Sequence, residues 1–367
     1  MVLWLGIAAW IFFLDRLLYN FRERWEYNGV VVTRVHILQA ILSMGPLVLF
    51  IGLRSSGADT SAYILSYNNY LTGAEGLEKV FDGSSKAVGF SLFTWFIKTF
   101  ISQDYHVYLF VIAAISGISV GYALWKYSDY FALSMILFIL TGTYTWMING
   151  IRQFMAAALG FLAIDLLLKK KRIAYMVFVL FLCTIHVSAV ILLVAVLFNV
   201  DNPFDYRIFL VLLGTLLIMR YAGFFVDLLE SSVESTVYEG ITGSFAGDDG
   251  VNPMRVVVTA VPLFLIYWGR GIYRRKTLPI YDLCVIMTIM ATAIYLVGVV
   301  TSGIIIGRLP IYFTLYTLIL LPWETNDLLK NERKFMTVAM LAGYLAYFYL
   351  QGRMYYKSDI LGLFIPA

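Results

Sequence analysis

The stretch YHVYLFVIAAISGISVGYAL, residues 105–124, contains no Asp, Glu, Lys or Arg. Its length matches the about 20 apolar residues with which an α-helix crosses the hydrocarbon core of a bilayer. Apolar runs of similar length recur from one end of the chain to the other. Of the 367 residues, 61% are hydrophobic and 14% are charged, whereas a soluble domain carries about 25% charged residues. The composition excludes an ordinary soluble enzyme and predicts an all-α polytopic membrane protein.

Lys and Arg gather in some of the loops between these runs and are missing from another. Loops rich in Lys and Arg stay in the cytoplasm, so we expect four loops there: 16–34, 169–172, 270–276 and 330–334. Residues 223–253 hold six acidic residues and no Lys or Arg. This charge pattern predicts an acidic loop, residues 223–254, on the outer face of the membrane.

The apolar runs can be threaded between these loops as about eleven to twelve transmembrane helices with both termini outside. The expected spans are 3–19, 36–53, 105–124, 129–148, 152–168, a pair within 173–199, 207–222, 255–269, 280–300, 309–325 and 335–351. Segment 173–199 leaves two alternatives. A single helix would place the acidic loop in the cytoplasm, whereas a hairpin bent near His186 keeps every charged loop on its expected side. We therefore favour the hairpin.

The whole chain, residues 1–367, is expected to form a single transmembrane domain with a long outer loop at 54–104. Within that loop, Ser91, Thr94, Lys98 and Ser102 recur at helical spacing opposite apolar residues of the stretch 90–100. Such a pattern predicts an amphipathic helix lying in the outer interface. The alternative is a further transmembrane helix, which would reverse the side of every later loop.

Ionisable and polar side chains from four separate segments are expected at the outer membrane face, where they are candidates for function. The residues are Arg54, Asp59, Tyr63, Arg152, Gln153, His186, Arg308 and Tyr312. Each also has a simpler interpretation. An arginine at a helix end often anchors the helix at the interface, a histidine in an apolar helix can be a hydrogen-bonded core residue, and Asp59 could cap the helix that starts beside it.

Arg152 is the hardest of these residues to explain by structure alone. It follows Asn149 and Gly150, so a turn would place its guanidinium at a helix N-terminus. A cation is unfavourable at that end of the helix dipole, and the backbone N–H groups there bind anions. Arginines in an outer cavity therefore suggest a substrate that carries phosphate or diphosphate. His186 could take the proton of an attacking hydroxyl group, and Asp59 could do so instead or orient the histidine.

Other classes of catalytic motif are missing from the sequence, which has no H-E-x-x-H, P-loop, C-x-x-C or G-x-S-x-G pattern. We therefore expect neither metal catalysis nor ATP hydrolysis. Five ordered stretches carry a resemblance: LRSSGADTSAY at 53–63, GFSLFTWFIK at 89–98, NGIRQFMAAAL at 149–159, HVSA at 186–189 and GRLPIYF at 307–313. In this order they resemble the EpsG family of bacterial polysaccharide-synthesis membrane proteins, a branch of the Wzy-like O-antigen and exopolysaccharide polymerases. That family often has an acidic residue before the Gly-Phe pair, where this chain has Lys86, Ala87 and Val88.

The resemblance implies a fold like that of the GT-C membrane glycosyltransferases, in the bacterial plasma membrane with the active site facing the periplasm or exterior. It also implies that oligosaccharide repeat units carried on undecaprenyl diphosphate are joined into a polysaccharide by an inverting, metal-independent transfer. Arg152, Arg308 and Arg54 would bind the diphosphate, with His186 or Asp59 as general base and Gln153, Tyr63 and Tyr312 in support. No cofactor and no nucleic acid are expected, and a chain-length regulator could be a partner. The alternatives are a ligase that moves finished polymer and a transporter of lipid-linked oligosaccharide.

Overall fold

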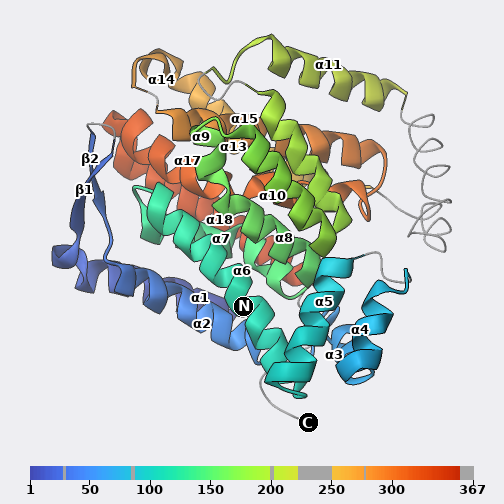
Figure 1. Ribbon diagram of the computed structural model, residues 1–367. Helices are drawn as coiled ribbons and strands as arrows, with labels where there is room; N and C mark the ends of the chain where they lie inside the picture. The colour runs from blue at the N-terminus through green and yellow to red at the C-terminus, as the bar shows by residue number, and fades with distance from the viewer. Residues whose placement is uncertain (28–29, 84–86, 199–201, 222–249, 277, 356–367) are drawn as a thin grey trace. The chain divides into compact units, whose positions relative to one another are not determined.

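The computed structural model describes residues 1–27, 30–83, 87–198, 202–221, 250–276 and 278–355, and most of the predicted acidic loop 223–254 lies outside them. These residues are mainly helical (Figure 1). They form two compact units, one of residues 1–164, 177–190 and 321 onward, and one of residues 165–176 and 191–320. The prediction of a single transmembrane domain stays a prediction.

Two helices in the described part of the chain are long and apolar enough to cross a membrane: α6 (Tyr105–Tyr127) and α15 (Pro279–Val300). A third span is formed if the pieces Ile306–Thr314 and Thr317–Leu328, bent by 52°, are counted together, and seven further apolar helices have 10–17 residues. The boundaries of α6 and α15 agree with the predicted spans 105–124 and 280–300. The helical membrane class is confirmed, whereas the number of crossings and their direction stay predictions.

Several predicted continuous spans are broken into shorter pieces. The span 129–148 consists of α7 (Phe131–Leu140) and a 3₁₀ segment, η3 (Thr143–Met147), separated by Gly142 at a φ of 74°. A residue with that φ cannot continue a right-handed helix, and glycine adopts it without steric cost. The remaining pieces are α8 (Ile151–Leu162), α9 (Ile164–Leu168), η6 (Ile306–Arg308), α16 (Ile311–Thr314), α17 (Thr317–Trp323) and the π-helical η7 (Glu324–Leu328). The predicted spans 129–148, 152–168 and 309–325 are thus each built of shorter pieces.

The first unit is built around close contacts between helices. Its other long helices are α1 (Val2–Leu17), α2 (Ile37–Gly52) and α18 (Arg333–Tyr355). Helix α2 packs along α6, which also packs against α8, and α1 and α18 both contact α7. A Cβ atom on Gly52 would lie 2.8 Å from the Cα of Phe110, and one on Gly117 would lie 2.4 Å from Val48 Cγ2. Small residues let helix backbones approach in this way in membrane proteins.

The predicted hairpin at 173–199 is present. The helix α10 (Arg172–Ile185) ends directly before His186, and a 3₁₀ segment, η4 (Val187–Leu197), follows. The hydroxyl of Tyr175 donates a hydrogen bond of 3.2 Å to the carbonyl oxygen of Leu192. In a straight element these residues would lie on the order of 25 Å apart, beyond the reach of a tyrosine side chain. The chain therefore turns back at His186.

The region 54–104 contains four helical segments where the sequence predicted one helix: α3 (Thr60–Asn68), α4 (Gly73–Phe81), α5 (Val88–Phe96) and the π-helical η2 (Ile97–Ile101). The polar stripe of α5 and η2 faces protein. Thr94 and Lys98 are buried, and Lys98 Nζ lies 2.7 Å from the carbonyl oxygen of Asn68 at the end of α3. The apolar residues Phe96 and Phe100 are exposed instead. Helical segments therefore occupy the predicted stretch, and part of its polar stripe packs against the end of α3. The position of this stretch in the outer interface stays a prediction.

The all-α prediction misses one feature of the basic loop 16–34. After the 3₁₀ turn η1 (Tyr19–Phe21), strands β1 (Glu23–Tyr27) and β2 (Val30–Arg34) pair as an antiparallel hairpin with Glu23 opposite Arg34 (Figure 1). The 3₁₀ segment η8 (Lys330–Glu332) lies in a second basic loop. A two-stranded hairpin satisfies many of its own backbone hydrogen-bonding groups.

In the second unit α15 is the central helix. It contacts α13 (Pro253–Trp268), α11 (Tyr206–Arg220), α16 and η6, and α14 (Arg270–Lys276) follows α13. The backbone N–H of Val251 donates to the carbonyl oxygen of Gly298 at 2.9 Å. Cβ atoms on Gly298 and Gly307 would lie 2.7 and 2.6 Å from Val251 Cγ2. Glycine at both positions thus holds η6, which carries Arg308, against the end of α15.

Candidate functional site

Hydrogen bonds in the first unit join three segments that are distant in sequence: residues 54–63, 150–153 and 186–188. Six of the eight predicted site residues belong to these segments: Arg54, Asp59, Tyr63, Arg152, Gln153 and His186. We call these six residues, together with Ser188, the first-unit cluster. The sequence predicted their convergence, and the contacts below show how it is made.

Arg54 lies inside the protein, with 1% of its surface exposed. Its Nε donates to Thr60 Oγ1 at 2.8 Å, and its Nη1 donates to the carbonyl oxygen of Ile51 at 2.7 Å. Its Nη2 has no hydrogen-bond partner among the described residues. Burial lowers the pKa of Arg54 to about 10, so the guanidinium keeps its charge at neutral pH. In this conformation Arg54 ties the end of α2 to the start of α3.

Asp59 holds the turn that precedes α8. Its Oδ2 accepts a hydrogen bond of 3.0 Å from the backbone N–H of Gly150. Gly150 is the N-cap residue of α8 with a φ of 71°, a conformation that favours glycine. Asp59 makes no side-chain cap bond to its own helix α3. Asp59 still occupies the N-cap position of α3, as the simple interpretation expected. Its carboxylate, however, connects α3 to the segment that carries Arg152.

Arg152 is exposed and is held by contacts from two other segments. Its Nε donates to the hydroxyl of Tyr63 at 3.3 Å, and its guanidinium carbon lies 5.6 Å from the centre of the Phe90 ring. An arginine over an aromatic face gains electrostatic stabilisation without losing all of its hydration. Arg152 is thus oriented by Tyr63 and Phe90 while its charge stays accessible to a ligand.

His186 is connected to α8 through Ser188. The Oγ of Ser188 lies 2.7 Å from His186 Nδ1, and Gln153 Nε2 donates to the same Oγ at 3.2 Å. A hydroxyl oxygen can accept two hydrogen bonds, so Ser188 can receive one from Gln153 and one from a protonated Nδ1. That arrangement leaves Nε2 of His186 without a proton. The contact chain therefore permits the tautomer that a general base needs.

Helix α5 lies against the same part of the chain. A Cβ atom on Gly89 would lie 2.1 Å from Thr184 Oγ1, near the end of α10. Only a glycine allows the backbone of α5 to approach Thr184 this closely. Phe90, the next residue, carries the Arg152 contact. The Gly-Phe pair thus connects the residues before His186 to Arg152.

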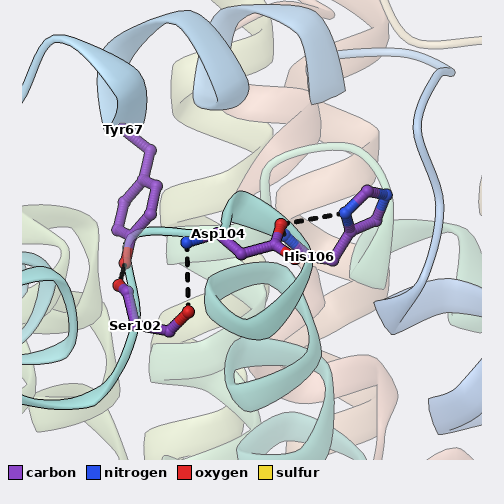
Figure 2. A network of polar contacts seen from close by, with 4 residues as sticks. All are labelled: Tyr67, Ser102, Asp104 and His106. Atoms are coloured by element: carbon purple, nitrogen blue, oxygen red, sulfur yellow. Dashed lines mark hydrogen bonds and ion pairs between the residues drawn. The ribbon is translucent and has the colours of Figure 1, made fainter.

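A second polar network supports the cluster from α3 and α6 (Figure 2). The hydroxyl of Tyr67 donates to the carbonyl oxygen of Ser102 at 2.6 Å. Asp104 Oδ1 accepts from the backbone N–H of His106 at 2.9 Å and lies 2.9 Å from His106 Nδ1. These contacts with His106 hold the pKa of Asp104 below its usual range. They cap the N-terminus of α6, and the Tyr67 bond joins α3 to Ser102 just before that helix.

Arg308 and Tyr312 belong to the second unit. Arg308 ends η6 and is exposed, whereas Tyr312 in α16 has 1% of its surface exposed. Their participation in a common site with the first-unit cluster stays a prediction.

Three residues inside the stretches 53–63, 89–98 and 186–189 have contacts that the sequence did not predict. Thr60 accepts a hydrogen bond from Arg54 within its own segment, whereas Phe90 and Ser188 contact residues of α8. Glu324 was missed altogether. It is fully buried in the π-helical η7, and neither carboxylate oxygen has a hydrogen-bond partner among the described residues. Burying a carboxyl group within an apolar run costs free energy. An isolated Glu in such a run is therefore a signal of function that can be read from the sequence.

Within the described ranges, no three His, Cys, Asp or Glu side chains gather as a metal-binding group. A comparison with family models gives a match to the EpsG family over residues 37–364. This range includes the whole first-unit cluster as well as Arg308 and Tyr312. No curated protein and no solved structure matches the chain.

Proposed function

This chain belongs to the EpsG family, and on that premise we propose that it is a polysaccharide polymerase. The enzyme joins oligosaccharide repeat units carried on undecaprenyl diphosphate, at the outer face of the bacterial plasma membrane. The observation that supports this most strongly is the contact chain from Gln153 through Ser188 to His186, which begins at the residue next to the exposed Arg152. It brings a potential base and a phosphate-binding cation to one part of the first unit.

The proposed reaction is a direct displacement. The oxygen of an acceptor hydroxyl bonds to the anomeric carbon of the donor sugar as the bond from that carbon to the diphosphate oxygen breaks. The hydroxyl proton moves to Nε2 of His186, and the diphosphate leaves with the electron pair of the broken bond. Attack opposite the leaving group inverts the anomeric centre. No metal is needed in this scheme because guanidinium groups meet the charge of the diphosphate.

Arg152 is the proposed ligand of the departing diphosphate. Negative charge grows on the leaving oxygen in the transition state, and a pre-oriented cation at that point lowers the barrier. Tyr63 and Phe90 supply the orientation. Asp59 is a positioning residue in this scheme, since it fixes the turn at Gly150 from which Arg152 extends.

Two predicted diphosphate ligands have a weaker basis. Arg54 is buried and bonded within its own segment, so it reaches a substrate only if α3 moves. The roles of Arg308 and Tyr312 rest on their stretch GRLPIYF alone. The proposal also includes a fold like that of the GT-C transferases and a chain-length regulator as partner.

The experiment is complementation of a deletion strain with wild-type protein or with His186→Ala. We expect the variant to reach the membrane in normal amount and to accumulate carrier-linked single repeat units. Accumulation of carrier-linked polymer would instead show a ligase. Normal polymer ladders from His186→Ala would contradict the assignment of the base. Purified protein with a defined lipid-linked repeat unit should then form polymer without other proteins.

A further inference from the structure

A groove of about 590 Å³ lies entirely within the second unit. It is formed by the first residue of α10, the end of η4 and the beginning of α11. The apolar part of its lining includes Val194, Leu197, Leu210 and Val211. Leu197 and Leu210 expose 64% and 55% of their surfaces. The groove thus presents aliphatic side chains over a volume typical of ligand sites.

Two arginines line the same groove, one from α10 and one from α11. Arg172 is the first residue of α10 and follows Lys169, Lys170 and Lys171. Arg207 lies in the first turn of α11, where its Nη1 donates to the carbonyl oxygen of Leu197 at 2.6 Å. Its Nε is 3.7 Å from Asp205 Oδ2, so part of its charge is balanced. The two arginines lining the groove outweigh the single carboxylate of Asp205 beside Arg207, so the lining is positive overall.

We propose that this groove binds an anionic phospholipid, with acyl chains along the aliphatic residues and the phosphate between Arg172 and Arg207. The aliphatic side chains of the lining suit the acyl chains of such a lipid, and the two arginines suit its phosphate. Guanidinium groups bind phosphate oxygens in pairs, and basic pockets between membrane helices hold anionic headgroups. The charge pattern predicts the cytoplasmic side for residues 169–172, where anionic lipid is also present. This site is independent of the proposed polymerase reaction.

The experiment is native mass spectrometry of purified, delipidated full-length protein with phosphatidylglycerol or phosphatidylcholine of identical acyl chains. We expect wild-type protein to prefer phosphatidylglycerol. Arg172→Gln should weaken its binding about fivefold, and the double variant with Arg207→Gln about 20- to 30-fold, since each arginine near an anionic lipid contributes about 1 kcal/mol. Phosphatidylcholine binding should change little.

Arg270→Gln is the matched control. Like Arg207, Arg270 lies over a neighbouring tyrosine, at 4.7 Å from the centre of the Tyr267 ring, but it does not line the groove. We expect it to keep wild-type lipid preference. If loss of the Arg207 contact to Leu197 disturbs the folding of the double variant, the single variant Arg172→Gln still tests the proposal. Equal binding of both lipids, an unchanged preference in Arg172→Gln, an equal loss in Arg270→Gln, or displacement of the lipid by millimolar inorganic phosphate would each overturn the proposal.

Discussion

Two segments of the first unit each bring one arginine to the same cluster, and they use it differently. Arg54 is buried, and the hydrogen bonds of its guanidinium to Thr60 and Ile51 stay within residues 51–60. Arg152 is exposed and is held by side chains from α3 and α5. The guanidinium of Arg54 therefore stabilises the fold, whereas that of Arg152 is oriented and accessible to a ligand. The comparison predicts that the exposed Arg152, and not the buried Arg54, meets the substrate.

The largest effect should come from Arg152→Ala. Removing one pre-oriented group that stabilises transition-state charge typically costs about 10²- to 10³-fold in rate, so we expect polymer formation by purified enzyme to fall by that factor. The melting temperature should stay within about 2 °C of wild type, because an exposed side chain contributes little to stability. Arg152→Lys should recover only part of the activity, since an ammonium lacks the planar fork. Full activity in Arg152→Ala would contradict the proposal that Arg152, unlike Arg54, binds the substrate.

Arg54→Ala should show the reverse pattern, with stability as the main loss. It leaves a cavity and removes two buried hydrogen bonds, so we expect a cost on the order of 3 kcal/mol in the free energy of unfolding. Thermal unfolding in one detergent, followed by tryptophan fluorescence, measures the loss. Arg54→Met fills more of the space without burying a charge and should be less damaging. If Arg54→Ala melts like wild type but loses activity as Arg152→Ala does, Arg54 is a substrate ligand after all.

The sequence predicted much of this arrangement because its strongest signals are local. Apolar length set the boundaries of α6 and α15 within a few residues, and the basic loops together with His186 predicted the hairpin. The pair Asn149–Gly150 predicted the turn before α8, which the φ of Gly150 confirms. These features depend on backbone conformation and on hydrophobicity, which neighbouring residues largely decide.

Other features depend on which distant segment lies opposite, and the sequence did not reveal them. Nothing near Arg54 distinguishes it from Arg152 until α2 and α3 are packed around it. The polar stripe through Lys98 has the pattern of a water-facing surface, yet α3 covers it. Periodicity identifies a face but not its partner. Hydropathy similarly misses the break at Gly142, because a break leaves the apolar character of the run unchanged.

A smaller effect is expected at Ser188, which contacts Gln153, the neighbour of Arg152. Ser188→Ala removes the oxygen that Gln153 and His186 share, so the imidazole loses the contact that permits protonation at Nδ1 with Nε2 free. We expect about a tenfold lower rate, within the range for general base catalysis, and an altered pH dependence in the acidic limb of the rate profile. Ser188→Thr keeps the hydroxyl and should restore the profile. A parallel loss of rate at every pH, with no change of shape, would indicate a packing defect instead.

The smallest effect tests how Arg152 is held. Tyr63→Phe removes the hydroxyl that accepts from Arg152 Nε but leaves the ring and the Phe90 contact in place. The bond is long at 3.3 Å and lies in an exposed setting, so its net contribution should be about 0.5–1 kcal/mol, equivalent to a two- to fivefold change in kcat/KM. If Tyr63 acts only by orienting Arg152, the variant Tyr63→Phe should have no further effect in an Arg152→Ala background, as a double-mutant cycle would measure. An undiminished effect of Tyr63→Phe in that background would mean that Tyr63 contacts the substrate itself, and the exposed arginine would then lose one of the two supports that set it apart from Arg54.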